Sequence, residues 1–152
     1  MSVQFTGFSP TRELDTFLIW NEAKNLDEFI RGLQYFDFGS LNWAYADVTG
    51  NIAYFAGGEM PVREDLQAGS VNGLPPWFIR NGTGGNEWLP AQHPQPGQAG
   101  TYEILPFDEM PHVINPPAGW FVNANNDPVG TTLDNNSLNQ LRPGGGHLLP
   151  QS

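Results

Sequence analysis

Glycine and proline are the residues that most restrict what this chain can fold into. The 152 residues include 18 glycines and 14 prolines, and the two together are about 12 % of an average protein but roughly a fifth of this one. Both residues break helices, so this content argues against a helical bundle. The chain also carries 10 Phe, 5 Trp and 4 Tyr, an apolar content that argues against intrinsic disorder. We therefore expect a folded α+β chain with long loops.

Charge and cysteine content exclude several classes of function. There are 16 acidic and 6 basic residues, which gives a net charge of −10. This balance disfavours nucleic acid and anionic membrane as partners, because both repel an acidic surface. No apolar run reaches the length of a membrane span, and MSVQFTGFSP at the start lacks the pattern of a signal peptide. The absence of cysteine excludes disulfides, thiolate metal sites and a Cys nucleophile, but leaves the compartment open.

Helical patterns occur only in the first quarter of the chain. Ser9-Pro10 predicts a helix start, with Ser9 as the N-cap and Pro10 in the first turn. A second helix is predicted to begin after Asn25, because Glu28 follows it at capping-box spacing. Apolar residues then recur at helical spacing as far as Phe36, and Gly39 is the expected stop.

Residues 42–58 predict a β-hairpin. Aromatic and small residues alternate in NWAYA and again in IAYFA, and a turn-forming cluster separates the two runs. The cluster begins at Asp47, and turn chemistry explains it better than a calcium loop, because the later acidic ligands of an EF-hand are missing. Alanines on one face of both strands are expected to admit a closely packed further layer.

The rest of the chain reads as loops, with one more strand predicted at 119–126. Repeated turn signals fill residues 59–119. A loop of this length is uncommon in a compact domain, so we expect this segment to wrap a larger body or to line a site. The two helices and few strands also suggest an incomplete domain.

The local patterns alone identify no catalytic group. The three histidines, His93, His112 and His147, are scattered, which favours surface or loop positions over a transition-metal site. Adjacent carboxylates such as Asp108 and Glu109 point to different sides and form a poor acid–base pair. By composition alone, the asparagines at 123–126 read as a turn, although an Asn side chain can also stabilise an oxyanion.

Three segments in order carry a resemblance to a known family. NWAYADVTGNIAYFAGG at 42–58 is similar to one stretch of the penicillin acylases. PFDEMP at 106–111 resembles a second piece, and NPPAGWFVNANNDP at 115–128 resembles a third. Ordered blocks over roughly residues 9–136 make the match specific. The chain is thereby identified as a member of the penicillin acylase (penicillin amidase) family of N-terminal-nucleophile hydrolases.

The resemblance implies a fold and a reaction. The fold is part of a four-layer α/β/β/α sandwich, here with two N-terminal helices, a β-hairpin and long Gly/Pro-rich loops. Members are made as zymogens that cleave themselves into α and β chains. The new N-terminal Ser of the β chain, activated by its own amine, then hydrolyses linear amides through an acyl-enzyme. The substrates are penicillins, which links the family to antibiotic biosynthesis, or N-acyl homoserine lactones. No residue in this sequence discriminates between them.

The resemblance also implies two site residues. In the N-x-N-N-x-P motif, Asn125 takes the place of the oxyanion-hole asparagine, and Asn123 and Asn126 shape the turn that directs it. A calcium ion often has a structural role in the family, and Asp134 is the nearby carboxylate that suits this cation. No other cofactor is implied. Beyond Pro128 the spacing departs from the family pattern, and the surroundings of Arg142 do not match the expected arginine.

The family's nucleophile has no counterpart in this chain. Ser2 falls at an internal position of the family pattern, which argues against it as the catalytic serine. We therefore expect an internal fragment of a β chain, with residues 1–141 as a partial domain and 142–152 as a disordered tail. Its partners would be the rest of the β chain, the α chain and a small amide substrate. Family members are exported, to the periplasm or beyond, and the chain alone is expected to be inactive.

One alternative belongs to another class of function. Trp77, Phe78, Trp88 and Trp120 lie among Gly/Pro loops, as in a stand-alone module that binds a ligand such as a carbohydrate through exposed aromatic side chains.

Overall fold

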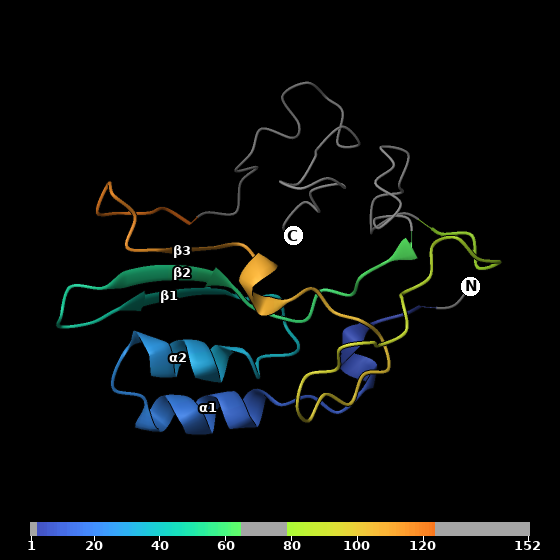
Figure 1. Ribbon diagram of the computed structural model, residues 1–152, viewed down its shortest axis with the longest axis horizontal. Helices are drawn as coiled ribbons and strands as arrows, with labels where there is room; N and C mark the ends of the chain where they lie inside the picture. Colours follow the sequence, from blue (N-terminus) through green and yellow to red (C-terminus); the bar gives the residue numbers. More distant parts are fainter. Residues whose placement is uncertain (1–2, 65–78, 124–152) are drawn as a thin grey trace.

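The computed structural model of the chain describes residues 3–64 and 79–123, which form two layers. A pair of helices covers one face of a three-stranded antiparallel sheet with the order β1-β2-β3, as Figure 1 shows. The elements in chain order are η1 (Thr6–Phe8), α1 (Glu13–Glu22), α2 (Leu26–Leu33), β1 (Asn42–Ala46), β2 (Ile52–Ala56), η2 (Phe107–Glu109) and β3 (His112–Ile114). This content agrees with the predicted α+β class. Within the described ranges, no helix is long and apolar enough to cross a membrane.

Helix α2 begins where the sequence predicts. The Asn25 side chain accepts a 2.9 Å hydrogen bond from the Glu28 backbone N–H. Glu28 in turn accepts one from the backbone N–H of Lys24 at 2.7 Å, so the reciprocal pair is a capping box displaced by one residue. The helix ends at Leu33, before the expected stop, and Gly39 instead takes a left-handed conformation (φ 113°) in the connection to the sheet.

The predicted start of the first helix is wrong by one turn. Ser9 follows η1 in extended conformation, and α1 begins only at Glu13. A distant carboxylate fixes the N-cap residue, because the backbone N–H of Arg12 donates to Asp37 Oδ2 at 2.9 Å. A local sequence pattern contains no information about a partner 25 residues away.

The hairpin is confirmed, but the alanines do not share one face. Trp43 pairs with Phe55 and Tyr45 with Ala53, so Ala53 lies on the face toward the helices. The outer face carries small and apolar side chains that are exposed or half-buried: Ala44, Ala46, Ile52, Tyr54, Ala56 and, from β3, Val113. This face is mostly apolar, with Asn42 at one end accepting a hydrogen bond from the Tyr54 hydroxyl at 2.6 Å, and the described residues leave much of it open.

The third strand lies where the sequence predicts loop. β3 pairs with β2 through Ala53↔Ile114, Tyr54↔Val113 and Phe55↔His112. The predicted strand at 119–126 is wrong for its described part, residues 119–123, which has no strand pairing. The remaining loops are held by isolated bridges, Pro61↔Ile104, Arg63↔Trp88 and Pro90↔Tyr102. Three residues of β3 with mixed polarity are too few to show an alternating pattern.

Aromatic packing joins the two layers. The Trp20 ring stacks on Phe29 with the ring centroids 4.6 Å apart and meets the edge of Trp43 at the same distance. Trp20 also donates from Nε1 to the Phe29 carbonyl at 2.8 Å. Gly32 makes room for it, since a Cβ there would lie 2.6 Å from Trp20 Cδ1. Below these rings lies the buried core of Leu33, Phe36, Ala53 and Phe55.

The close contact at Gly32 predicts that Gly32→Ala destabilises the fold. Overpacking a core costs about 1–3 kcal/mol, whereas alanine gains at most about 1 kcal/mol over glycine inside a helix. We expect a lower free energy of unfolding in urea. Gly82→Ala is the control, because a Cβ there meets nothing within 4 Å, and it should be neutral or slightly stabilising. Unchanged or higher stability of Gly32→Ala would contradict the contact.

Candidate functional site

The candidate site is built around the segment that leads to the asparagine motif. After β3 the chain turns at Asn115, and the Gly119 N–H donates to the Pro116 carbonyl at 2.8 Å. The segment then runs back along the sheet, as the orange trace of Figure 1 shows. Phe121 lies with its ring 6.1 Å from that of Tyr54, on the face of the sheet opposite the helices.

Asn115 fixes the point where this return begins. It has a left-handed conformation (φ 46°), which asparagine tolerates better than most residues. Its backbone N–H donates to the Ile52 carbonyl at 2.9 Å, and its Oδ1 accepts from the Ile52 N–H at 3.0 Å. Its Nδ2 donates to Asn51 Oδ1 at 2.9 Å. The turn is therefore locked to the hairpin by three hydrogen bonds.

Asp47 organises the hairpin side of this junction. Its Oδ1 accepts from the Thr49 N–H, the Thr49 hydroxyl and the Asn51 N–H at 2.7–3.0 Å. Its Oδ2 accepts from Asn51 Nδ2 at 2.8 Å and from the Tyr45 hydroxyl at 3.0 Å. The hydrogen bonds from Asn51, then those from Thr49, lower the pKa of the Asp47 carboxyl well below its usual range. Protein donors thus engage both oxygens of Asp47, and residues 48–50 form the predicted turn.

A second polar cluster lies at the other end of the sheet. Arg12 and Asp37 form a buried ion pair, with Nη2 to Oδ1 at 2.6 Å and Nε to Oδ2 at 2.9 Å. Arg12 Nη1 also donates to the Pro96 carbonyl at 2.6 Å. The hydrogen bond to Asp37 raises the pKa of Arg12. Next to this pair, the Tyr102 hydroxyl donates to Glu59 at 2.7 Å.

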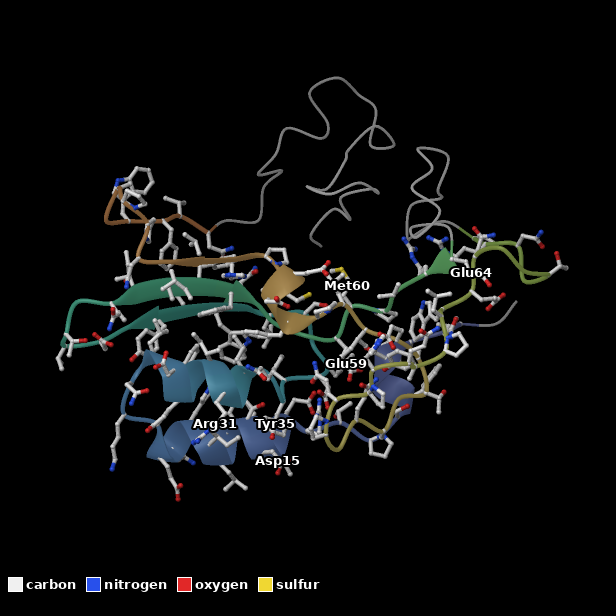
Figure 2. The ribbon with its side chains drawn as sticks, viewed as in Figure 1. Asp15, Arg31, Tyr35, Glu59, Met60 and Glu64 are labelled. Carbon is white, nitrogen blue, oxygen red and sulfur yellow. The ribbon has the colours of Figure 1, made fainter. Side chains whose placement is uncertain are left out.

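Burial controls the titration of this second cluster. It raises the pKa of Glu59, and it also raises that of Tyr102, whose hydroxyl is bonded to Glu59. Figure 2 labels Glu59 and Tyr35 beside the end of the helical layer. The Tyr35 ring lies 5.1 Å from the Arg12 guanidinium carbon, a cation–π distance. The cluster therefore joins the N-terminal segment, the α2–β1 connection and the loops into one frame.

A cavity of about 410 Å³ opens beside the ion pair. Its wall includes His93 and Glu103, whose Nδ1 and Oε1 atoms lie 2.9 Å apart. Glu103 also accepts the backbone N–H groups of Gln92 and His93, which lower its pKa. The lining residues are Arg12, Gln34, Tyr35, His93, Gln95, Pro96, Glu103, Ile104, Pro106 and Phe107. None of them is Ser, Thr or Cys, so these residues offer no nucleophile of that kind.

The structure does not describe the residues to which the resemblance assigns a catalytic or calcium-binding role. Asn125, Asp134 and Ser2 are outside the described residues, as are Asn126 and His147. Asn123, an exposed residue, is the last that the structure describes before the motif continues. His112 lies in β3 and stacks on Phe55 at 5.9 Å. Among residues 3–64 and 79–123, no three His, Cys, Asp or Glu side chains gather in a way that could hold a metal ion.

The two described aromatic residues of the alternative function, Trp88 and Trp120, do not form a common surface. Trp88 packs its ring edge against Tyr102 at 4.7 Å, whereas Trp120 is 66 % exposed. Trp77 and Phe78 lie outside the described residues. The described part of the chain therefore gives this alternative no specific support.

The comparisons with known proteins agree with one another. A family model described as penicillin amidase matches residues 1–143. Penicillin G acylase from Escherichia coli is 33 % identical over 120 residues, which are 77 % of this chain but 12 % of that protein. The solved structure of a thermostable penicillin G acylase from Alcaligenes faecalis is 31 % identical with a TM-score of 0.53, over 78 % of this chain and 18 % of its own. The chain thus spans a small part of the length of both relatives.

The hydrogen bonds to Asp47 predict a pH-dependent effect of Asp47→Asn. A lowered native pKa stabilises the fold above the ordinary value of 3.8, and this stabilisation is lost as the pH falls through the native value. We expect Asp47→Asn to reduce the urea midpoint at neutral pH, and the difference from wild type to shrink progressively below about pH 4. Thr49→Val should show a smaller loss with the same direction. A difference that does not depend on pH would contradict this assignment.

The buried ion pair predicts a large effect of Asp37→Ala. The substitution leaves the Arg12 guanidinium in a buried site without its carboxylate, which costs about 3–5 kcal/mol in comparable buried pairs. We expect a loss of this order in the free energy of unfolding, measured by urea denaturation. Asp108→Ala, at an exposed position, serves as the control and should stay within about 0.5 kcal/mol of wild type. Equal effects of the two substitutions would refute the structural role of the pair.

Proposed function

Because this chain belongs to the penicillin amidase family, we propose that it supplies one part of an amidohydrolase that cleaves linear amide bonds. The observation that carries the proposal is the locked turn at Asn115, followed by a segment that leads directly into the N-x-N-N-x-P motif. A motif that must present one side chain to a reacting group needs a rigid entry of this kind. The two relatives named penicillin G acylase support the same class of reaction.

We propose that Asn125 supplies the oxyanion donor. Its side-chain N–H₂ would donate to the negatively charged oxygen that develops when a nucleophile attacks the amide carbonyl. Donors fixed in place before the reaction stabilise the transition state without a reorganisation cost, and removing one costs about 2.7–4 kcal/mol. The nucleophile would be an N-terminal Ser contributed by another part of the amidase, activated by its own amine, with an acyl-enzyme as intermediate.

The outer face of the sheet supports the four-layer sandwich. Small side chains such as Ala44 and Ala46 lie exposed beside half-buried Tyr54 and Val113. Two sheets pack about 10 Å apart through such apolar faces. We propose that a second sheet of the amidase covers this face, with α1 and α2 forming one outer helical layer.

The remaining assignments follow from the family and are part of the proposal. The partners would be the rest of the β chain and the α chain of a self-cleaving precursor exported from the cytoplasm. The substrate would be a penicillin or an N-acyl homoserine lactone. Asp134 would be a ligand of a structural calcium ion, since carboxylate oxygens suit this cation. The described residues offer no further cluster of ligands for it, and no catalytic step depends on the ion.

The proposal is tested by transferring the chain into a complete enzyme of the same family. Residues 1–143 replace the matching segment of the Escherichia coli penicillin G acylase, and hydrolysis of penicillin G is measured. We expect activity from this carrier, a loss of about 10²–10³ in kcat with Asn125→Ala, and none from the 152-residue chain alone. Asn81→Ala, in an exposed turn, is the control. Activity that survives Asn125→Ala but disappears with Ser2→Ala would overturn the assignment.

A further inference from the structure

Helix α1 carries an apolar stripe on the side away from the core. Leu14, Phe17 and Leu18 are 78 %, 45 % and 65 % exposed, and their spacing places them on one face of the helix. Thr16 is fully buried on the other face. Figure 1 shows α1 on the outside of α2, away from the strands. Single exposed apolar side chains are ordinary, whereas a contiguous stripe marks an interaction surface.

Acidic side chains border this stripe. Asp15 and Glu22 are both exposed, and a separation of two turns places them along the same edge of the helix. A second copy of the chain would bring these charges against its own and would repeat the net charge of −10. The surface therefore fits a basic partner better than a copy of itself.

We propose that this stripe is the docking surface for a basic amphipathic α-helix from the remaining amidase polypeptide. A helix suits the surface, because residues spaced by three and four pack into the grooves of a second helix. The source of that helix rests on the proposed function. The relatives are long enough to contain such a helix outside the matched segment, since this chain covers only 12 % of one and 18 % of the other. In a four-layer sandwich α1 lies in an outermost layer, so this contact adds a layer beyond the four.

The absence of cysteine from the sequence allows a direct test. Leu18→Cys introduces the chain's sole thiol, and its reaction with a maleimide is followed by mass spectrometry. The rate is compared between the 152-residue chain and the same residues carried in the Escherichia coli acylase. We expect at least tenfold slower labelling in the carrier. Val48→Cys, at the fully exposed hairpin tip, should label at similar rates in both. Equal rates for Leu18→Cys, or equal protection of both positions, would overturn the proposal.

This readout separates the inference from the proposed function. Protection in a carrier that does not hydrolyse penicillin G would keep the docking surface and reject the catalytic role. Hydrolysis of penicillin G without protection of Leu18→Cys would keep the catalytic role and reject the docking surface.

A second measurement needs no carrier. A synthetic helix with leucines at positions 1, 4, 5 and 8 of its stripe and lysines along the edge is titrated into the 152-residue chain. Binding is followed by the change in intrinsic fluorescence, to which Trp20, with its ring centroid 5.8 Å from that of Phe17, contributes beside the chain's four other tryptophans. We expect the same helix with glutamates at its edge to bind at least tenfold more weakly, and Leu14→Lys to abolish binding. Equal affinity of the two helices, or no binding of either, would overturn the proposal.

Discussion

The stacking of Trp20 on Phe29 and against Trp43 is the contact on which the rest of the structure depends. It joins α1, α2 and β1 at a single point. A hairpin alone is marginally stable in water and needs a covered face. Since the helices provide that cover, they also stabilise β2 as the template for β3. The turn at Asn115, which is bonded to Ile52 at the start of β2, therefore depends indirectly on a tryptophan in the first helix.

Two polar networks stabilise the two ends of this aromatic layer. One is local in the sequence, and the other joins distant segments. At the hairpin tip, Asp47 acts within a few residues of chain and reaches Asn115 only through Asn51. At the opposite end, Arg12 and Asp37 join segments that are far apart in the sequence. Both networks depend on carboxylates with nearly all their oxygen lone pairs engaged, an arrangement that favours a single geometry. Such order suits the role that we propose for the segment after Asn115, which is to position the side-chain amide of Asn125.

The features that the sequence predicted correctly are those with local causes. Asn25 and Glu28 cap α2 within four residues, and the alternation on both sides of Asp47 defines the hairpin. The start of α1 was not predictable, because the Asp37 carboxylate that binds the N-cap residue Arg12 comes from beyond the second helix. β3 is too short to display a period, and its pairing with β2 is a property of the fold. The family's motif identifies Asn125, which stays a prediction because the described residues end at Asn123.

The apolar outer faces of this unit also bear on how it survives before assembly. Exposed apolar surface on a partly assembled chain favours aggregation with identical neighbours. Here 16 acidic residues are set against 6 basic ones, so two such units repel each other at a distance where their apolar faces cannot yet meet. The excess of carboxylates thereby lowers the rate at which two copies of the chain meet, and it leaves the sheet face and the helix stripe available for the segments that we propose to cover them.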